Sequence, residues 1–159
     1  MSLSVGSPAP DFSLHCHKGG KVTLSELKGQ NVVLLFFPFA NTGVCTKEMC
    51  TFRDGMSVYN DLNAKVIGIS VDSPFSLALW AEKNGLQFDL LSDFNKTTIK
   101  DYDSVFDVFG AGKWDFAGVS KRSAFVVDKD GIIRYMEILP SPGDEPNYDA
   151  IKKTVESLS

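Results

Sequence analysis

Two runs of hydrophobic residues lack the alternation that is typical of a half-exposed strand. They are Asn31–Phe37 and Lys65–Val71, and both are rich in β-branched or aromatic residues. A strand that is covered on both faces has this uninterrupted pattern, because neither side of it meets water. We therefore predict that both segments are buried strands and that Asn31–Phe37 is central.

Hydrophobic residues at helical spacing follow each run. After Gly43 they recur every three or four residues, which predicts a helix with one buried side. These positions are Met49, Phe52, Met56 and Tyr59. After the second run, Ser73-Pro74 supplies an N-cap and a first-turn proline, and Gly85 ends the helix. The order strand, helix, strand, helix requires parallel crossovers, so the predicted class is α/β.

The rest of the chain predicts shorter elements around this centre. Paired glycines in Lys18-Gly19-Gly20 suit the turn of an N-terminal β-hairpin within Asp11–Leu24. The other predicted elements are a strand at Leu90-Leu91, a helix over Asn95–Tyr102, a hairpin of Ala124–Val127 with Ile132–Ile138, and a last helix carrying Tyr148, Ile151, Val155 and Leu158. The pattern assigns no element to Asp103–Lys121.

Length and charge narrow the function classes. The 159 residues fit a single domain, 1–159, with its own core. The formal net charge of -4 argues against nucleic acid as a partner. The longest hydrophobic run, Val32–Ala40, contains a proline and is far shorter than the roughly 20 residues of a membrane span. Met1–Pro10 does not resemble a secretory signal, so we expect a soluble, cytoplasmic protein without membrane contact.

One cysteine stands where a buried strand gives way to a helix. Cys45 lies in the predicted first turn, among unpaired N–H groups and at the positive end of the helix dipole, which favours a thiolate. Thr42 can donate a hydrogen bond to the sulfur or to a bound oxygen, and Pro38 makes the preceding loop rigid. The alternative is that Cys45 is a small buried hydrophobic residue.

The motif Pro38-x-x-x-Thr42-x-x-Cys45 resembles the active-site signature of the peroxiredoxins, and the resemblance extends from Gly6–Phe12 through the final helix. It implies a thioredoxin-like fold, in which helices flank a central mixed β-sheet, and a peroxidase without a cofactor or metal. By this resemblance the Cys45 thiolate attacks a hydroperoxide and becomes a sulfenic acid. Thioredoxin, glutaredoxin or a small thiol would then reduce it.

Two charged residues match further family positions. Arg122, directly before Ser123, corresponds to an arginine beside the thiolate, which would stabilise both the thiolate and the charge developing on the peroxide. Glu48 corresponds to a glutamate that orients such an arginine. The alternatives are an exposed cation at a strand start for Arg122 and an acid favoured by the helix dipole for Glu48. For Arg53 we expect a structural ion pair.

The second cysteine of the helix leaves two mechanisms open. Cys45 and Cys50 have the spacing of peroxidatic and resolving cysteines in the bacterioferritin-comigratory, or peroxiredoxin Q, group, which implies an intramolecular disulfide. An intact helix separates them too far for that bond, so its first turns would have to unwind. However, Ala40–Cys45 resembles the one-cysteine alkyl hydroperoxide reductase E type, in which Cys50 would be a bystander and an external thiol would act.

The remaining expectations concern Cys16, oligomeric state and rival functions. Cys16 alternates with His15 and His17 on a predicted strand, so these side chains do not converge on a metal. The resemblance implies a homodimer, with a monomer as the alternative. A thiol-disulfide oxidoreductase normally uses Cys-x-x-Cys, which this chain lacks. A redox-sensing or chaperone-like binding module is the alternative from another class.

Overall fold

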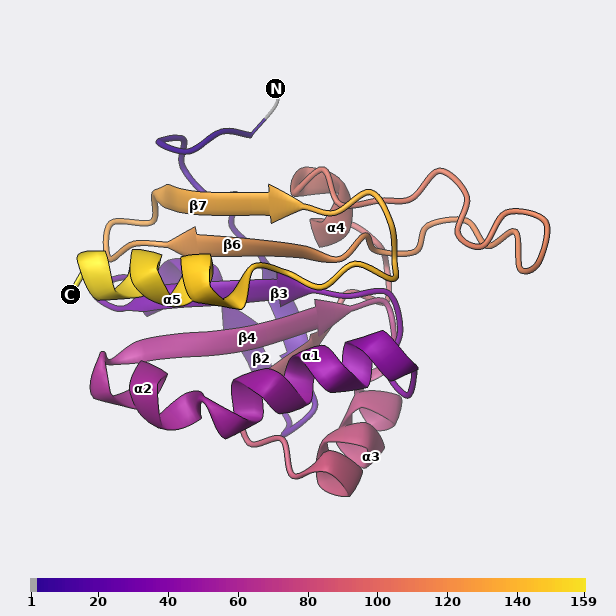
Figure 1. Cartoon of the computed structure of the whole chain (residues 1–159), viewed down its shortest axis with the longest axis horizontal. Helices are drawn as coiled ribbons and strands as arrows, with labels where there is room; N and C mark the ends of the chain where they lie inside the picture. Colours follow the sequence, from indigo (N-terminus) through magenta and orange to yellow (C-terminus); the bar gives the residue numbers. More distant parts are fainter. Residues whose placement is uncertain (1–2) are drawn as a thin grey trace.

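A seven-stranded mixed sheet organises the protein in the computed structural model, which describes residues 3–159 (Figure 1). The strands are β1 (Ser13–Cys16), β2 (Lys21–Thr23), β3 (Asn31–Phe36), β4 (Ala64–Ser70), β5 (Asp89–Ser92), β6 (Ser123–Val127) and β7 (Ile133–Ile138). The helices are the 3-10 helix η1 (Leu24–Leu27) and the α-helices α1 (Gly43–Asp54), α2 (Met56–Asp61), α3 (Pro74–Asn84), α4 (Thr98–Asp101) and α5 (Tyr148–Ser157). These bounds confirm every predicted strand and the two hairpins.

The strands are arranged in the order β2-β1-β5-β4-β3-β6-β7. β3, β4 and β5 are parallel neighbours, joined by helical crossovers, whereas β6 runs antiparallel to β3 and β7 runs antiparallel to β6. The N-terminal hairpin pairs antiparallel with β5 through β1. All six residues of β3 are buried, as its uninterrupted hydrophobic pattern predicts.

Two hydrophobic clusters lie on the two faces of the sheet. Helices α1, α2, α3 and α5 cover one face, where Met49, Trp80 and Ile151 pack against the strands (Figure 1). The other face packs against η1, α4 and the N-terminal segment, through residues such as Leu24 and Tyr102. Because alternate residues of a strand point to opposite faces, Leu35 belongs to the first cluster and its neighbours in sequence belong to the second.

Gly68 makes room for large side chains that pack on the face of the sheet covered by α1. A Cβ atom at this position of β4 would lie 2.7 Å from Leu90 Cδ2, 3.3 Å from Phe37 Cε1 and 3.4 Å from Met49 Sδ. A side chain at this position would therefore collide with Leu90 of β5 and press on Phe37, which follows β3. The glycine leaves room for these side chains between the sheet and α1.

Two predicted helices differ from the structure. The helix expected through Met49 and Tyr59 is divided into α1 and α2 at Gly55, although Phe52 and Tyr59 remain in contact with ring centroids 5.7 Å apart. The helix expected over Asn95–Tyr102 begins only at Thr98. Lys96 has a φ of 62°, which no α-helix accommodates.

Candidate active site

The pairing of β3 with β6 brings the ends of two distant segments together. Because the strands are antiparallel, Ser123 at the start of β6 lies opposite Phe36 at the end of β3. Arg122 precedes Ser123, and alternation along the strand sends its side chain to the face that α1 covers. The loop that follows β3 leads directly into α1. The arginine therefore meets the start of that helix.

The loop between β3 and α1 is held by backbone contacts. Pro38 is buried just after the strand, and Asn41 adopts the left-handed conformation with a φ of 65°. The Ala40 N–H donates a hydrogen bond of 2.8 Å to Asp72, which follows β4. Thr42 is the N-cap residue in an extended conformation, and its carbonyl accepts from the Thr46 N–H at 2.9 Å. These contacts fix where the first turn of α1 begins.

Cys45 lies on the buried face of α1. The buried residues of this helix are Cys45, Glu48, Met49 and Phe52. Their spacing places all of them on one side of the helix, toward the sheet. The side chain of Cys45 is only 1% exposed, and it lies in the first turn of the helix, where backbone N–H groups lack intrahelical partners. A negative charge on its sulfur is therefore favoured by the helix dipole.

Arg122 bridges this sulfur and a buried carboxylate. Its Nη2 donates to Cys45 Sγ at 3.3 Å and to the Pro142 carbonyl at 3.0 Å, while Nη1 donates to Glu48 Oε1 at 2.6 Å. Arg122 is 1% exposed and Glu48 is fully buried. Burial alone would lower the pKa of Arg122, but the neighbouring Glu48 and Cys45 raise it. The guanidinium therefore stays charged.

Burial governs the charge of Glu48. It raises the pKa of this carboxyl to about 7, although Arg122 opposes the shift. Glu48 Oε2 and Arg122 Nε are buried without a hydrogen-bond partner. Glu48 is therefore a carboxyl group that changes its charge near neutral pH, one helical turn from Cys45 and joined to it by a single guanidinium.

The sequence matches the AhpC/TSA family over residues 5–136. The chain belongs to this family. Its match spans the strand, the loop and the helix that carry Cys45, and it includes Arg122 and β6.

Similar proteins are named as peroxiredoxins or as an alkyl hydroperoxide reductase. The chain is 38% identical over 143 residues to alkyl hydroperoxide reductase E of Mycobacterium tuberculosis, covering 89% of each chain. It is 39% identical over 134 residues to the chloroplastic peroxiredoxin Q of Triticum aestivum, covering 84% of this chain and 58% of that protein. The crystal structure of a peroxiredoxin-like protein from Aquifex aeolicus superimposes with a TM-score of 0.89 at 25% identity, covering 100% of this chain and 90% of that one. The protein is a thiol-dependent peroxidase of the peroxiredoxin family, and the predicted thioredoxin-like α/β fold is confirmed.

The structure of this peroxiredoxin brings together four of the six predicted site residues. Cys45, Arg122 and Glu48 are joined by hydrogen bonds, and Pro38 is buried in the loop that leads to them. In the described residues, 3–159, Thr42 does not make the expected hydrogen bond to the sulfur of Cys45. Thr42 is exposed, and its hydroxyl donates instead to the Phe39 carbonyl at 2.8 Å.

Cys50 lies apart from Cys45 in this peroxiredoxin. It is half-buried on another side of α1, with its sulfur 4.0 Å from Asn84 Oδ1 near the end of α3. Both cysteines are free thiols. Arg53 is paired structurally, as predicted, since it bonds to Asp54 at 2.9 Å and to the Asn84 carbonyl at 2.6 Å.

Cys16 lies on the opposite side of the sheet from Cys45. It belongs to the cluster that packs against η1 and α4, and burial raises the pKa of its thiol. His15 is exposed beside it, while His17 Nδ1 accepts a hydrogen bond from the Leu90 N–H at 3.1 Å. In residues 3–159 no three His, Cys, Asp or Glu side chains are grouped as metal ligands would be. Within the same residues, no helix has the length and hydrophobicity needed to cross a membrane.

The sequence did not indicate two groups that complete the site. The Pro142 carbonyl accepts from Arg122, and Asp72 holds the loop before α1. Pro142 lies in the loop between β7 and α5, and a backbone carbonyl leaves no signature in the sequence. Asp72 follows the predicted strand that ends at Val71, so its position at the carboxyl edge of a parallel strand was the available signal.

Proposed function

We propose that the Cys45 thiolate is the nucleophile with which this peroxiredoxin reduces hydrogen peroxide and organic hydroperoxides. The observation that carries the proposal is the 3.3 Å contact between Arg122 Nη2 and Cys45 Sγ at the buried start of α1. A guanidinium and the positive end of a helix both favour thiolate over thiol. The same guanidinium stabilises the negative charge that develops on the leaving oxygen.

The proposed reaction is a displacement at oxygen. The sulfur attacks the terminal oxygen of the hydroperoxide and the O–O bond breaks. The electron pair leaves with the other oxygen, which takes up a proton and departs as water or an alcohol. Cys45 is oxidised to a sulfenic acid while the peroxide is reduced. In this proposal the Thr42 hydroxyl turns from Phe39 toward the bound peroxide, and Pro38 keeps the loop rigid and presents no N–H.

A thiol reductant must return Cys45 to its reduced form. We propose thioredoxin, glutaredoxin or a small thiol in the cytoplasm, where such reductants keep thiols reduced. The test is steady-state peroxide consumption with each reductant in turn. Turnover with at least one of them supports the proposal, whereas no turnover with any of them would contradict it.

We further propose that Cys50 resolves the sulfenic acid. The two thiols lie on different sides of α1, so the first turns must unwind before a disulfide can form. Oxidation with one equivalent of peroxide is expected to link Cys45 to Cys50 and to lower helical circular dichroism. Peptide mass mapping checks the link, and Cys50→Ser provides the control that stops at sulfenic acid. A wild-type protein with sulfenic acid on Cys45 and a free Cys50 would point to an external thiol instead.

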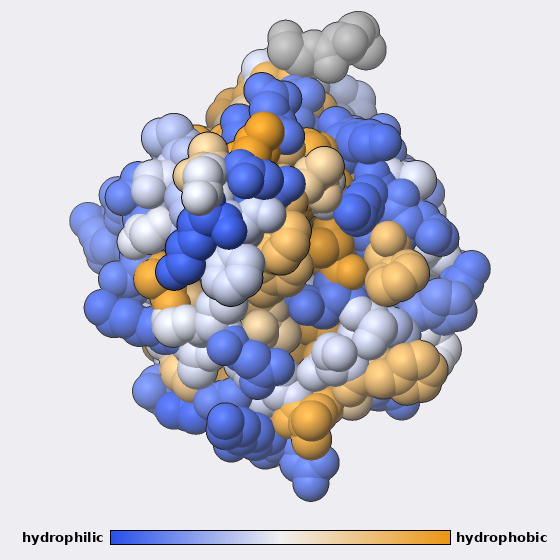
Figure 2. All heavy atoms as spheres, turned by 90° about the vertical axis from the view of Figure 1, so that its right-hand side faces the viewer, coloured by the Kyte–Doolittle hydropathy of each residue, from blue (hydrophilic) through white to orange (hydrophobic). Residues whose placement is uncertain are grey.

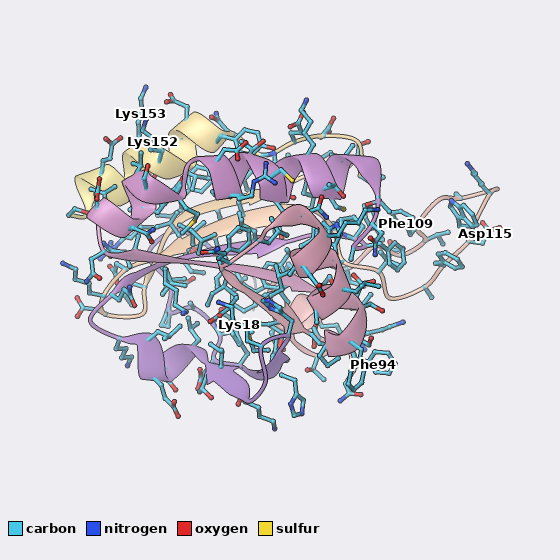
Figure 3. All side chains as sticks on the ribbon, turned by 90° about the horizontal axis from the view of Figure 1, so that it is seen from below. Lys18, Phe94, Phe109, Asp115, Lys152 and Lys153 are labelled. Atoms are coloured by element: carbon cyan, nitrogen blue, oxygen red, sulfur yellow. The ribbon has the colours of Figure 1, made fainter. Side chains whose placement is uncertain are left out.

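We also propose that the protein is a homodimer joined near the active site. Exposed hydrophobic side chains gather at the carboxyl edge of the parallel strands, on the face shown in Figure 2. They are Phe75 after β4, Phe94 after β5, and Val108, Trp114 and Phe116 in the loop before β6. This loop projects from the molecule, with Phe109 at its base and Asp115 at its tip (Figure 3). An exposed patch of this kind is typical of an interaction surface.

Sedimentation measures the dimer directly. The wild type is expected at twice the 17.4 kDa mass of the chain, and the double variant Phe94→Asp/Trp114→Asp at the monomer mass. Val5→Asp is the matched control, because Val5 is also an exposed hydrophobic residue but lies outside the patch. A dimer that survives the double variant, or a wild-type monomer, would argue against this surface.

A further inference from the structure

One cation faces two acidic groups inside the site. Among residues 3–159, Arg122 is the only lysine or arginine that bonds to Cys45 or to Glu48. Both acids are shielded from water, with Cys45 1% exposed and Glu48 0% exposed. If both were ionised, the buried group would carry a net negative charge, which a low-dielectric interior disfavours strongly. The arrangement is electrically neutral only when one of the two acids holds a proton.

We propose that Glu48 holds the proton that Cys45 gives up, so that Arg122 faces one anion at a time, and that Glu48 releases this proton when Cys45 is oxidised. This inference rests on the proposed role of Cys45 as the nucleophile. It makes Glu48 a positioning residue with a second task, because its carboxyl keeps the charge of the site balanced through the reaction.

The surroundings of Glu48 favour its protonated form. Its Oε2 has no partner, so only Oε1 is stabilised as an anion, by one bond to Arg122. Glu137 on β7 and Glu145 before α5 both disfavour further negative charge there. The titratable and charged groups that face Glu48 are Cys45, Arg122, Glu137, Glu145 and Tyr148. Lys47 pairs with Glu145 at 3.0 Å and offsets part of that charge, but it makes no ion pair with Glu48. The pKa of about 7 reflects burial beside Arg122, Glu145 and Glu137. An ionised Cys45 at the same guanidinium raises the pKa of Glu48 further, so the carboxyl keeps its proton above neutral pH for as long as Cys45 is a thiolate.

The proton balance follows from the reaction. Before turnover the site holds an ionised Cys45, a protonated Glu48 and a charged Arg122. Sulfur attack breaks the O–O bond and produces a neutral sulfenic acid and an alkoxide or hydroxide, which needs one proton. Once Cys45 is neutral, Glu48 is the only acid that can supply a negative charge to Arg122. Glu48 therefore gives up its proton, and this proton equals the one that the leaving group takes up. The site is neutral before and after the step, and the solution supplies no net proton.

A single-turnover proton count tests this balance. The Cys50→Ser protein is mixed with one equivalent of hydrogen peroxide in weak buffer with a pH indicator, at about pH 8, where Glu48 paired with Arg122 alone is mostly ionised. The thiolate absorbance of Cys45 is confirmed first. We expect the Cys50→Ser protein to take up well below half a proton per Cys45. The double variant Cys50→Ser/Glu48→Gln should take up about one proton per Cys45. The glutamine keeps the hydrogen bond to Arg122 but cannot carry the proton.

The outcomes separate this inference from the proposed function. Uptake of about one proton in both proteins, with sulfenic acid found on Cys45 by mass spectrometry, would overturn the inference and leave the function standing. A purely structural Glu48 would slow the reaction in the glutamine variant without changing the proton count. If no sulfenic acid forms on Cys45, both proposals fail. If the glutamine variant does not fold, the parent protein alone decides, because one proton taken up per ionised Cys45 already contradicts the balance.

Discussion

The Cys45→Ser protein is expected to consume no hydroperoxide above the uncatalysed rate. Serine is close to cysteine in size, so the packing at the start of α1 changes little, but its hydroxyl does not ionise near neutral pH and cannot accept the peroxide oxygen. The loss should be complete in a steady-state assay with any thiol reductant, whereas the melting temperature should change little.

Cys16→Ser provides the matched control for this substitution. Cys16 is a buried cysteine as well, but it belongs to the cluster on the other side of the sheet. Peroxide consumption should remain near the wild-type rate in this variant. Activity that survives in Cys45→Ser but disappears in Cys16→Ser would show that Cys16, and not Cys45, is the reacting sulfur.

Arg122→Met is expected to lower the second-order rate of Cys45 oxidation by about 10²- to 10³-fold, the effect of removing one preorganised donor from a site of developing charge. The variant loses the 3.3 Å contact to Cys45 Sγ and the 2.6 Å contact to Glu48 Oε1. Arg122→Lys should recover only part of the rate, because an ammonium group cannot bridge both acids as the planar guanidinium does. Stopped-flow mixing with peroxide measures both variants.

Arg53→Met is the control for the loss of an arginine. Arg53 lies in the last turn of α1, and its partners are Asp54 and the Asn84 carbonyl, away from Cys45. Its rate should stay within about twofold of wild type, as for most exposed ion pairs. Equal losses in the Arg53 and Arg122 variants would mean that Arg122 acts through general stability, which thermal unfolding would reveal.

The sequence predicted the elements with clear periodicity and missed the local interruptions. The strands β3 and β4 and the caps of α3 at Ser73 and Gly85 follow from local patterns, and the structure has them as expected. The helix breaks at Gly55, where the helix propensity is low. The hydrophobic periodicity does not reveal this break, because it continues from α1 into α2. The loop before β6 lacks periodicity, so its projecting course could not be predicted (Figure 1).

The site was predictable as a set of residues but not as a geometry. Cys45 could be placed at a helix start from the strand and helix around it. Arg122 reaches it only because β6 runs antiparallel to β3, and no local pattern specifies that pairing. Glu48 shares the buried spacing of Cys45 and Phe52, which could have indicated a buried acid rather than a first-turn surface residue.

The most direct measurement is to locate the oxygen atom after a single turnover. Cys50→Ser protein is treated with one equivalent of hydrogen peroxide and then with a sulfenic-acid trap, and its peptides are mapped by mass spectrometry. The trap should label Cys45 in nearly every molecule and leave Cys16 as a free thiol. An unlabelled Cys45, or a label on Cys16 instead, would contradict the assignment of Cys45 as the reacting sulfur.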